Sequence, residues 1–315
     1  MPNLESVGKI VITGAAGLVG QNLLVRLKAM GCADIVAIDK HPTNTPALAR
    51  LHPDIRVIQA DLARDDHWQD SLNGAAALVQ MHAQIGGLQW QEFEDNNIAA
   101  TQRVLAAAEA AGVPYLVHAS SSVVNSAAND FYTQSKGAQE KLVDASAIPH
   151  VILRPTLMFG WFDRKHLGWL ARFMKRTPLF PIPGDGRFIR QPLYVGDFCD
   201  IIVSCLQNRA TGTHDITGQQ RILYIELIRQ VKRAVRARCL IVPIPYALFD
   251  ALLRLYAVFD SHPPFTVKQL KALVLPEEFA VIDWPGVFGV RSTPLAEALE
   301  ATFNDPRYSS IVLDF

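Results

Sequence analysis

The stretch "KIVITGAAGLVG", residues 9–20, joins a short apolar run to a glycine-rich turn. Its first five residues are rich in β-branched side chains, as buried strands are. Gly14, Gly17 and Gly20 follow at three-residue intervals, and an amphipathic segment (18–30) begins at once. Glycines let a backbone turn tightly and approach a pyrophosphate, whose charge the N–H groups at the start of a helix can receive. The stretch therefore predicts a strand, a phosphate-binding turn and a helix.

The first half of the chain alternates such apolar runs with helical patterns, which is typical of βαβ units and a parallel sheet. The segment "EDNNIAATQRVLAAAEAAG" (94–112) repeats apolar residues at helical spacing and closes on Gly112, a C-cap residue. We therefore predict an α/β fold with a doubly wound parallel Rossmann sheet. The candidate strands are residues 9–13, 34–38, 55–59, 77–81, 115–119 and 150–154.

The composition of the chain changes after residue 160, where proline and glycine concentrate in "TPLFPIPGDG" (177–186). We expect residues 1–160 to form an NAD(P)-binding Rossmann domain and residues 161–315 to form mainly a smaller C-terminal substrate-binding region. Part of the second region, about 188–206, is expected to return to the Rossmann domain.

Acidic residues follow the second and third candidate strands. A carboxylate at Asp39 can accept hydrogen bonds from both ribose hydroxyls of a dinucleotide and would repel a 2′-phosphate, so it favours NAD over NADP. Lys40 and His41 come directly after it and could blunt that preference, so NADP stays possible. Asp61 could meet the adenine amine or, as an alternative, cap a helix over "ARDDHWQDSL" (63–72).

Hydroxyl groups and an ammonium group follow the fifth candidate strand. Ser120, Ser121 and Ser122 come at its carboxyl end, where open α/β folds bind ligands. The stretch "DFYTQSKGAQEKL" then places Tyr132 and Lys136 four residues apart, on one face of a helix. An adjacent ammonium and a cationic nicotinamide would both favour the phenolate, so Lys136 could tune Tyr132 as a proton carrier in hydride transfer. The alternative is a surface tyrosine beside a solvated lysine.

The composition disfavours several classes of function. Thirty Lys and Arg residues balance thirty Asp and Glu residues, which leaves no net field to hold nucleic acid or an anionic membrane. The four cysteines have no Cys-x-x-Cys spacing, so we predict reduced, buried thiols and no metal site. They are Cys32, Cys199, Cys205 and Cys239.

The longest apolar run, "CLIVPIPYALFDALLRLYAVF" (239–259), is interrupted by two prolines, Asp250 and Arg254. These interruptions favour a buried or interfacial helix over a transmembrane span. The first fourteen residues lack a basic region followed by an apolar one, so we expect a cytoplasmic protein.

Together these motifs resemble the extended short-chain dehydrogenase/reductase family, and in particular its nucleotide-sugar epimerases and reductases. The resemblance covers nearly the whole chain, including a last helix like "TPLAEALEATF" (293–303). It implies an NAD-dependent enzyme with a nucleotide-sugar substrate, and a homodimer. The matching stretches are "TGAAGLVG" (13–20), "ADL" (60–62), "AQIGG" (83–87), "NNIAAT" (96–101), "SSS" (120–122), "YTQSK" (132–136) and "LRPTLMFG" (153–160).

The resemblance also implies roles for single residues. Tyr132 becomes the catalytic acid/base, Lys136 its partner and a nicotinamide-ribose contact, and Ser121 the hydroxyl that holds the reacting oxygen, with Ser120 and Ser122 as alternatives. Asn97 supports the active-site water and helix, and the chain passes the nicotinamide at Pro155 and Thr156. The residues expected at the cofactor are Gly14, Gly17, Leu18, Gly20, Asp39, Asp61, Leu62, Asn97, Lys136 and Pro155.

Three features depart from the family. His82 lies where relatives carry a small residue against the cofactor. Asn125 stands near the place of an expected tyrosine. The segment from the serine run to Tyr132 is short, which suggests a trimmed lid over the sugar.

In the second region, "PGDGRFIRQPLYVGDF" (183–198) places Arg187 and Arg190 in a loop that returns to a β-like run. In the resembling enzymes an arginine at the position of Arg190 grips the substrate diphosphate, a bidentate task that suits a guanidinium group. Surface arginines in salt bridges are the alternative. We expect Ser121, Ser122, Arg187 and Arg190 to bind substrate.

The expected activity is hydride transfer at the sugar C4, by a 4-epimerase or a 4-keto-sugar reductase. Asp39 favours the epimerase, which uses NAD only as an internal relay. A dehydratase is disfavoured, because that subgroup carries an acidic pair just after the serine or threonine, whereas Ser122, Val123 and Val124 follow Ser121 here. A hydroxysteroid-type or other secondary-alcohol dehydrogenase is the first alternative, and a non-catalytic Rossmann assembly subunit is the second.

Overall fold

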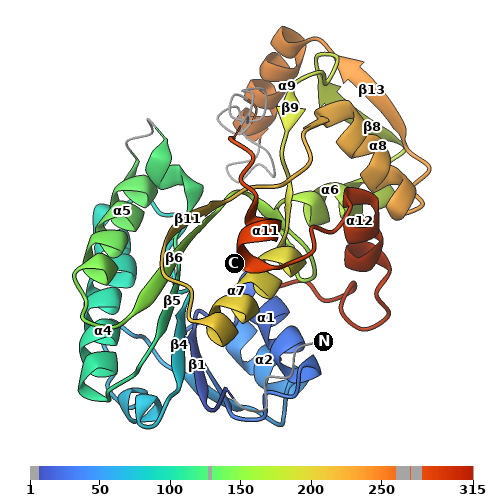
Figure 1. Ribbon diagram of the computed structural model, residues 1–315. Coiled ribbons are helices and arrows are strands. Elements are labelled where there is room, and N and C mark those ends of the chain that lie inside the picture. Colours follow the sequence, from blue (N-terminus) through green and yellow to red (C-terminus); the bar gives the residue numbers. More distant parts are fainter. Residues whose placement is uncertain (1–6, 127–129, 260–269, 271–278, 315) are drawn as a thin grey trace.

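The computed structural model describes residues 7–126, 130–259, 270 and 279–314. Its centre is a parallel sheet of seven strands in the order β11-β6-β5-β4-β1-β2-β3, flanked by helices (Figure 1). The strands are β1 (Ile10–Thr13), β2 (Ile35–Asp39), β3 (Arg56–Gln59), β4 (Ala77–Gln80), β5 (Leu116–Ala119), β6 (His150–Pro155) and β11 (Gly212–Ile216).

All six predicted strands are present, each within one residue of its expected bounds, so the doubly wound Rossmann sheet is confirmed. The seventh strand, β11, was not predicted. It pairs with β6 at the edge of the sheet, from Gly212 opposite Val151 to Ile216 opposite Pro155. An edge strand needs less apolar character than a central one, and "GTHDI" is mostly small or polar, which is why the pattern gave no signal.

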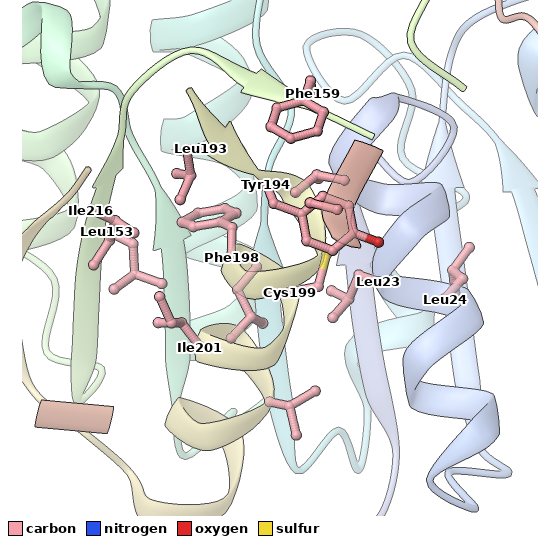
Figure 2. Close-up of a cluster of buried hydrophobic side chains, with 14 of the residues drawn as sticks. Leu23, Leu24, Leu153, Phe159, Leu193, Tyr194, Phe198, Cys199, Ile201 and Ile216 are labelled. Carbon is pink, nitrogen blue, oxygen red and sulfur yellow. The ribbon is translucent and has the colours of Figure 1, made fainter. Parts of the chain in front are cut away.

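The two faces of the sheet have separate apolar cores, because successive side chains of a strand point to opposite faces. Ile10 and Ile12 pack into the cluster that contains helices α1 (Leu18–Ala29) and α7 (Val195–Asn208). Val11 packs into the other cluster, with α4 (Ala100–Ala110). Figure 2 shows the first cluster, in which side chains of α1 and α7 meet the sheet.

Residues beyond 160 therefore contribute to the central layers. Helix α7 packs against α1, and β11 extends the sheet beside β6. Two cysteines of α7 lie in this apolar layer, and all four cysteines of the chain are free and buried, as predicted.

The remaining elements form small strand pairs with helices packed on them, and β8, β13, α8 and α9 lie together away from α4 and α5 (Figure 1). The pairs are β7 (Met158–Phe159) with β10 (Leu193–Tyr194), β9 (Ile189–Arg190) with β12 (Ile222–Leu223), and β8 (Leu179–Pro183) with β13 (Leu240–Ile244). The helices are α6 (Leu167–Arg176), α8 (Tyr224–Ala234), α9 (Tyr246–Phe259), α11 (Trp284–Phe288) and α12 (Leu295–Asn304).

The apolar run at 239–259 is a strand followed by a helix, and the prediction of one buried or interfacial helix was wrong for its first part. Pro243 and Pro245 prevent a helix from forming there, and β13 pairs in parallel with β8 instead. Helix α9 is not buried, since Leu248, Leu252 and Leu255 are about half exposed. Among the described residues, no helix has both the length and the apolar character that crossing a bilayer requires.

Two further helical predictions need correction. The segment 94–112 is helical, but it begins as a π-helix, η2 (Glu94–Ala99), which follows α3 (Trp90–Phe93) and leads into α4. The segment 63–72 is not an α-helix, because only a turn and the 3-10 helix η1 (Gln69–Leu72) form there. The other short helices are α2 (Asn44–Leu51) and η3 (Ser122–Asn125).

Candidate active site

The glycine-rich turn connects β1 to α1, and its three glycines are required for different reasons. Gly14 has a φ of +71°, and a Cβ there would lie 2.6 Å from the backbone nitrogen of His82. A Cβ on Gly20 would lie 2.4 Å from the carbonyl oxygen of Ala15. Gly17 has an ordinary φ of −77°, and its Cβ would meet nothing closer than 3.4 Å. The fold therefore demands glycine at 14 and 20, whereas it has room for a methyl group at Gly17, directly before α1 begins at Leu18.

Asp39 ends β2 and is tied to this turn. Its two carboxylate oxygens accept hydrogen bonds from the backbone N–H groups of Ala16 and His41, each at 2.9 Å. A carboxylate has about four acceptor sites, so two remain for other donors. Asp39 thus fixes the turn and still faces outward as a hydrogen-bond acceptor.

Asp61 follows β3 and stabilises the turn after it, since its Oδ1 accepts from the Ala63 N–H at 3.0 Å. Its Oδ2 lies 3.4 Å from the Nζ of Lys40, which also donates to the Asn96 side chain. Leu62 is buried, and its carbonyl accepts from Arg103 at 3.0 Å. These contacts hold the Lys40 side chain beside β3. Lys40 follows Asp39 in the sequence, but its ammonium group is engaged by Asp61 and Asn96.

Of the three serines, Ser121 is the one that contacts the tyrosine. The Ser121 side chain lies close enough to Tyr132 to lower the pKa of its phenol by hydrogen bonding. Ser120 is buried and its backbone N–H pairs with the Leu153 carbonyl, whereas Ser122 is the first residue of η3. Residues 127–129 of the short segment between Ser122 and Tyr132, which we expected to be a trimmed lid, lie outside the described residues.

Helix α5 (Phe131–Asp144) carries Tyr132 and Lys136 one turn apart, and Asp130 caps it by accepting from the Thr133 N–H at 2.8 Å. The pKa of Tyr132 is raised, because burial and the Asp130 carboxylate outweigh the hydrogen bond to Ser121. Lys136 was expected to lower the pKa of Tyr132, but it does not contribute to this shift. The protein's own groups therefore keep the phenol protonated.

Lys136 is buried, with 1% of its surface exposed. Its ammonium group donates to the carbonyl of Ala119 at 3.1 Å and to the Oε1 of Gln139 at 2.7 Å. Burial lowers the pKa of Lys136 from 10.5 to about 7, although Glu140 opposes the shift. Lys136 is therefore not the solvated lysine of the alternative interpretation.

Asn97 lies within the π-helix η2, a conformation that is frequent at functional sites. Its Nδ2 donates to the Ser135 hydroxyl at 2.8 Å, and its Oδ1 accepts from the Gln84 N–H at 2.6 Å. Asn97 thus joins the loop after β4 to α5, one residue before Lys136.

The end of β6 is fixed by a charged network. Arg154 makes two hydrogen bonds to Glu140 on α5, at 2.9 and 2.6 Å, and a third to Asn125 at 3.2 Å. Asn125 in turn donates to Asp215 of β11 at 2.8 Å. Pro155 ends β6 next to this network, and the N–H of Thr156 pairs with β11. Asn125, a departure from the family pattern, therefore braces the sheet edge.

The two predicted substrate arginines have different environments. Arg187 is exposed, with its N–H held by Asp185. Arg190 on β9 is buried, with its guanidinium 5.1 Å from the centre of the Phe188 ring. Arg190 is thus not one of the surface arginines of the alternative, and its side chain is held in place by packing.

Sequence reasoning missed two buried polar residues beside Lys136. Thr101 on α4 and Gln139 on α5 are fully buried, and Gln139 bonds to both Lys136 and Thr101. The available signal was the position of Gln139, three residues after Lys136 on the same helix face. His82, flagged as a departure, lies in the same cluster, because its Nε2 is 3.2 Å from the Thr101 hydroxyl.

Known proteins of similar sequence cover most of the chain. The rat NADH dehydrogenase (ubiquinone) 1 alpha subcomplex subunit 9 is 27% identical over 303 residues, covering 92% of this chain and 79% of that protein. A ceramide reductase from Caulobacter vibrioides is 23% identical and covers 95% of this chain and 91% of its own.

Solved structures show the same fold. A UDP-glucuronic acid 4-epimerase from Bacillus cereus, in complex with NAD, matches with a TM-score of 0.67 at 21% identity, covering 94% of this chain and 97% of its own. The enzyme WbmG from Bordetella bronchiseptica, in complex with NAD and UDP, has a TM-score of 0.73 at 19% identity, with coverages of 94% and 92%. The model of the NAD dependent epimerase/dehydratase family matches residues 10–217, so the chain belongs to that enzyme family.

Proposed function

We propose that this protein binds NAD and transfers hydride at C4 of a nucleotide sugar, as a 4-epimerase or a 4-keto-sugar reductase. The observation that carries the proposal is the position of Tyr132, whose pKa the Ser121 side chain at the carboxyl end of β5 lowers and which lies one helical turn from the buried Lys136. A hydroxyl, a phenol and an ammonium in that order are what proton transfer at a carbinol carbon needs.

The glycine-rich turn fits a dinucleotide. The absence of a side chain at Gly17 is not required by the fold, so it serves to leave the N–H groups of α1 accessible to a pyrophosphate. The two unused acceptor sites of Asp39 suit the hydroxyls of a ribose. Leu18, Asp61, Leu62, Asn97 and Pro155 remain part of the proposed cofactor site. NAD supplies the hydride acceptor, and the chain supplies the proton path.

In the proposed reaction Ser121 holds the reacting oxygen by a hydrogen bond while Tyr132 takes its proton. Because the protein's own groups raise the pKa of Tyr132, the phenol is protonated at rest. It is therefore set to give a proton in the reducing direction, and it needs the positive charge of the oxidised nicotinamide to act as a base. Lys136 holds the ribose on the side of Tyr132.

The substrate-binding region is proposed to consist of residues after 160 other than those of α7 and β11, which join the central layers. Within it, Arg190 is proposed to contact the diphosphate, Arg187 to lie at the rim of the site, and Ser122 to contact the sugar. A homodimer is part of the same proposal.

The test is a panel of UDP-, GDP- and dTDP-sugars added to the NAD-loaded protein, with products separated by chromatography and NADH followed by absorbance. Epimerisation of one sugar without net NADH formation supports the epimerase, and oxidation of added NADH by an added 4-keto-sugar supports the reductase. No turnover of any sugar, with turnover of apolar secondary alcohols, would contradict the proposal.

A secondary-alcohol dehydrogenase with an apolar substrate is the second candidate. It is favoured by the exposed leucines of α9, at positions 248, 252 and 255, which form one face of a helix in the region assigned to the substrate. The similarity to a ceramide reductase points the same way. An assembly subunit is the third candidate, because several relatives are subunits of a larger complex by name, and it does not account for Lys136 and Ser121 at Tyr132.

A further inference from the structure

A chain of buried polar side chains runs beneath the candidate site from α5 to the end of β1. Few of these groups were expected from the sequence, and they come from four different elements or their ends. Each is at most 8% exposed. They are Lys136 and Gln139 on α5, Thr101 on α4, Gln80 and His82 at the end of β4, and Thr13 at the end of β1.

The direction of the hydrogen bonds is fixed at the Lys136 end. Below the pKa of Lys136, about 7, its side chain is an ammonium group that can only donate, so the amide of Gln139 must turn its oxygen to Lys136, at 2.7 Å. Its Nε2 is then the atom that faces the Thr101 hydroxyl, at 2.8 Å. Thr101 therefore accepts from Gln139.

Thr101 has one proton to donate and two lone pairs to accept with. Besides Gln139, the Nε2 of Gln80 donates to the Thr101 oxygen at 3.0 Å. Both lone pairs are then used, so the hydroxyl proton must go to the third neighbour, the His82 Nε2 at 3.2 Å.

His82 must then carry its own proton on Nδ1. A neutral imidazole has one donor nitrogen and one acceptor nitrogen, and Nε2 is already the acceptor. Its Nδ1 lies 2.9 Å from the Thr13 hydroxyl and donates to it. Burial, together with Lys136 and Lys40, lowers the pKa of His82 to about 3, so the ring is neutral over the physiological range.

We propose that Gln139 is a positioning residue for Lys136, and that it aligns a one-directional hydrogen-bond chain from Lys136 through Thr101 and His82 to Thr13. Aligned donors strengthen one another in a buried site, so the chain holds the ammonium in one orientation. Thr13 directly precedes Gly14, so the chain ties the orientation of Lys136 to the glycine-rich turn. This function of Gln139 rests on the proposed role of Lys136, but the alignment itself does not.

The alignment is tested in the protein alone by nitrogen NMR of ¹⁵N-labelled histidine at about pH 5.5, where Lys136 is an ammonium group and His82 is neutral. The signal of His82 is identified by its loss in His82→Gln. We expect a neutral ring protonated on Nδ1. A wild-type ring protonated on Nε2 would overturn the proposed direction without any further variant.

Gln139→Glu tests whether Gln139 sets that direction. The new carboxylate at position 139 can only accept, so the Thr101 proton turns to it and the Thr101 lone pair turns to His82. We expect the His82 proton to move to Nε2, because Thr101 links the two side chains. Gln80→Leu is the matched control, because it also removes a buried glutamine from Thr101. In that variant Thr101 still accepts from Gln139, so its proton still goes to His82 and the tautomer should be unchanged. A Gln139→Glu spectrum like that of the wild type would refute the coupling.

Function is tested separately by titration with NAD. Gln139→Leu leaves Lys136 without its side-chain acceptor, and we expect NAD affinity to fall about tenfold, as for loss of one charge-assisted hydrogen bond. Gln80→Leu should bind NAD as the wild type does. Equal losses in both variants would reduce Gln139 to a structural role. If no variant or wild type binds NAD while the tautomers behave as expected, the proposed function fails and the alignment stands.

Discussion

The carboxyl end of β5 and the region around β9 each bury a cationic side chain, but in different ways. Lys136 is held by the hydrogen bonds that it donates to Gln139 on its own helix and to Ala119 at the end of the adjacent strand. Arg190 lies on a strand of two residues over the ring of Phe188, and its strand partner is Ile222, far along the chain. The first cation depends on local geometry, and the second depends on long-range pairing.

This difference decides what each region can do. A lysine held by short-range contacts keeps its position whatever substrate binds, which suits a proton carrier and a cofactor contact. An arginine carried by a small strand pair belongs to a region whose details can differ between relatives of one fold. Chemistry and substrate choice are thus separable, and variants in the two regions should affect different measurements.

The largest expected effect is that of Tyr132→Phe. Removal of the hydroxyl takes away the proton carrier, and we expect kcat on the identified substrate to fall by roughly 10²- to 10⁴-fold with NAD affinity nearly unchanged. Tyr115→Phe is the control, because the Tyr115 hydroxyl donates to the Ala210 carbonyl away from the site and its loss should alter only stability. Retention of most of the activity by Tyr132→Phe would remove Tyr132 from the mechanism.

The burial of Lys136 predicts a dependence of stability on pH. Its pKa falls from 10.5 to about 7 on folding, so between these values the unfolded chain binds more protons than the folded one. Stability then rises with pH across that window, by up to about 1.4 kcal/mol per pH unit. Lys136→Met removes this contribution, while all other groups titrate in both proteins. Urea unfolding from pH 6 to pH 10 should therefore show that the free energy of unfolding of the wild type rises with pH relative to that of Lys136→Met. A constant difference between the two free energies would mean a solvated lysine.

Arg190→Ala should act on substrate alone. If the substrate carries a diphosphate, loss of a charge-assisted contact costs about 1.5–3 kcal/mol, or roughly a ten- to hundredfold rise in substrate Kd, while NAD affinity barely changes. Arg229→Ala removes an exposed charge of the same region, one paired with Glu226, and serves as the control. Calorimetry with both ligands decides the matter. An unchanged substrate Kd would favour the secondary-alcohol candidate, and equal losses for both ligands would indicate a folding defect.

The glycine-rich turn offers a contrast within one motif. Gly17→Ala places a methyl group where the fold has room, so we expect normal stability and an approximately tenfold loss of NAD affinity, because the methyl displaces the pyrophosphate. Gly20→Ala would place a Cβ 2.4 Å from the Ala15 carbonyl, so it should lower the melting temperature as well. If Gly17→Ala binds NAD normally, the pyrophosphate does not lie on this turn.

The sequence predicted the strand ends and the motifs on them, because parallel strands bring consecutive motifs to one edge and each motif is read within a few residues. It could not predict β11, whose sequence has no apolar alternation, nor the pairs β7 with β10 and β9 with β12, which are two residues long. It left open which of the three serines acts on Tyr132. The three residues are identical in sequence, and they are told apart only by the start of η3 at Ser122. It missed the cluster of Thr101, Gln139 and His82, because buried polar residues are recognised by their partners and not by periodicity.

The smallest expected effect concerns the choice of cofactor at Asp39. The turn uses two acceptor sites of this carboxylate. The remaining acceptor sites and the negative charge of Asp39 favour ribose hydroxyls over a 2′-phosphate. Lys40 could have reversed the preference, but its ammonium is engaged by Asp61 and Asn96. We therefore expect NAD to bind more tightly than NADP. Asp39→Asn keeps the shape of the side chain and one acceptor oxygen but removes the charge, so it should narrow the difference between the two affinities by about tenfold. Asp39→Ala should also weaken NAD, since the N–H groups of Ala16 and His41 lose their acceptor. Fluorescence titration with both cofactors measures each effect, and tighter binding of NADP by the wild type would overturn the preference and shift the proposal from the epimerase to the reductase.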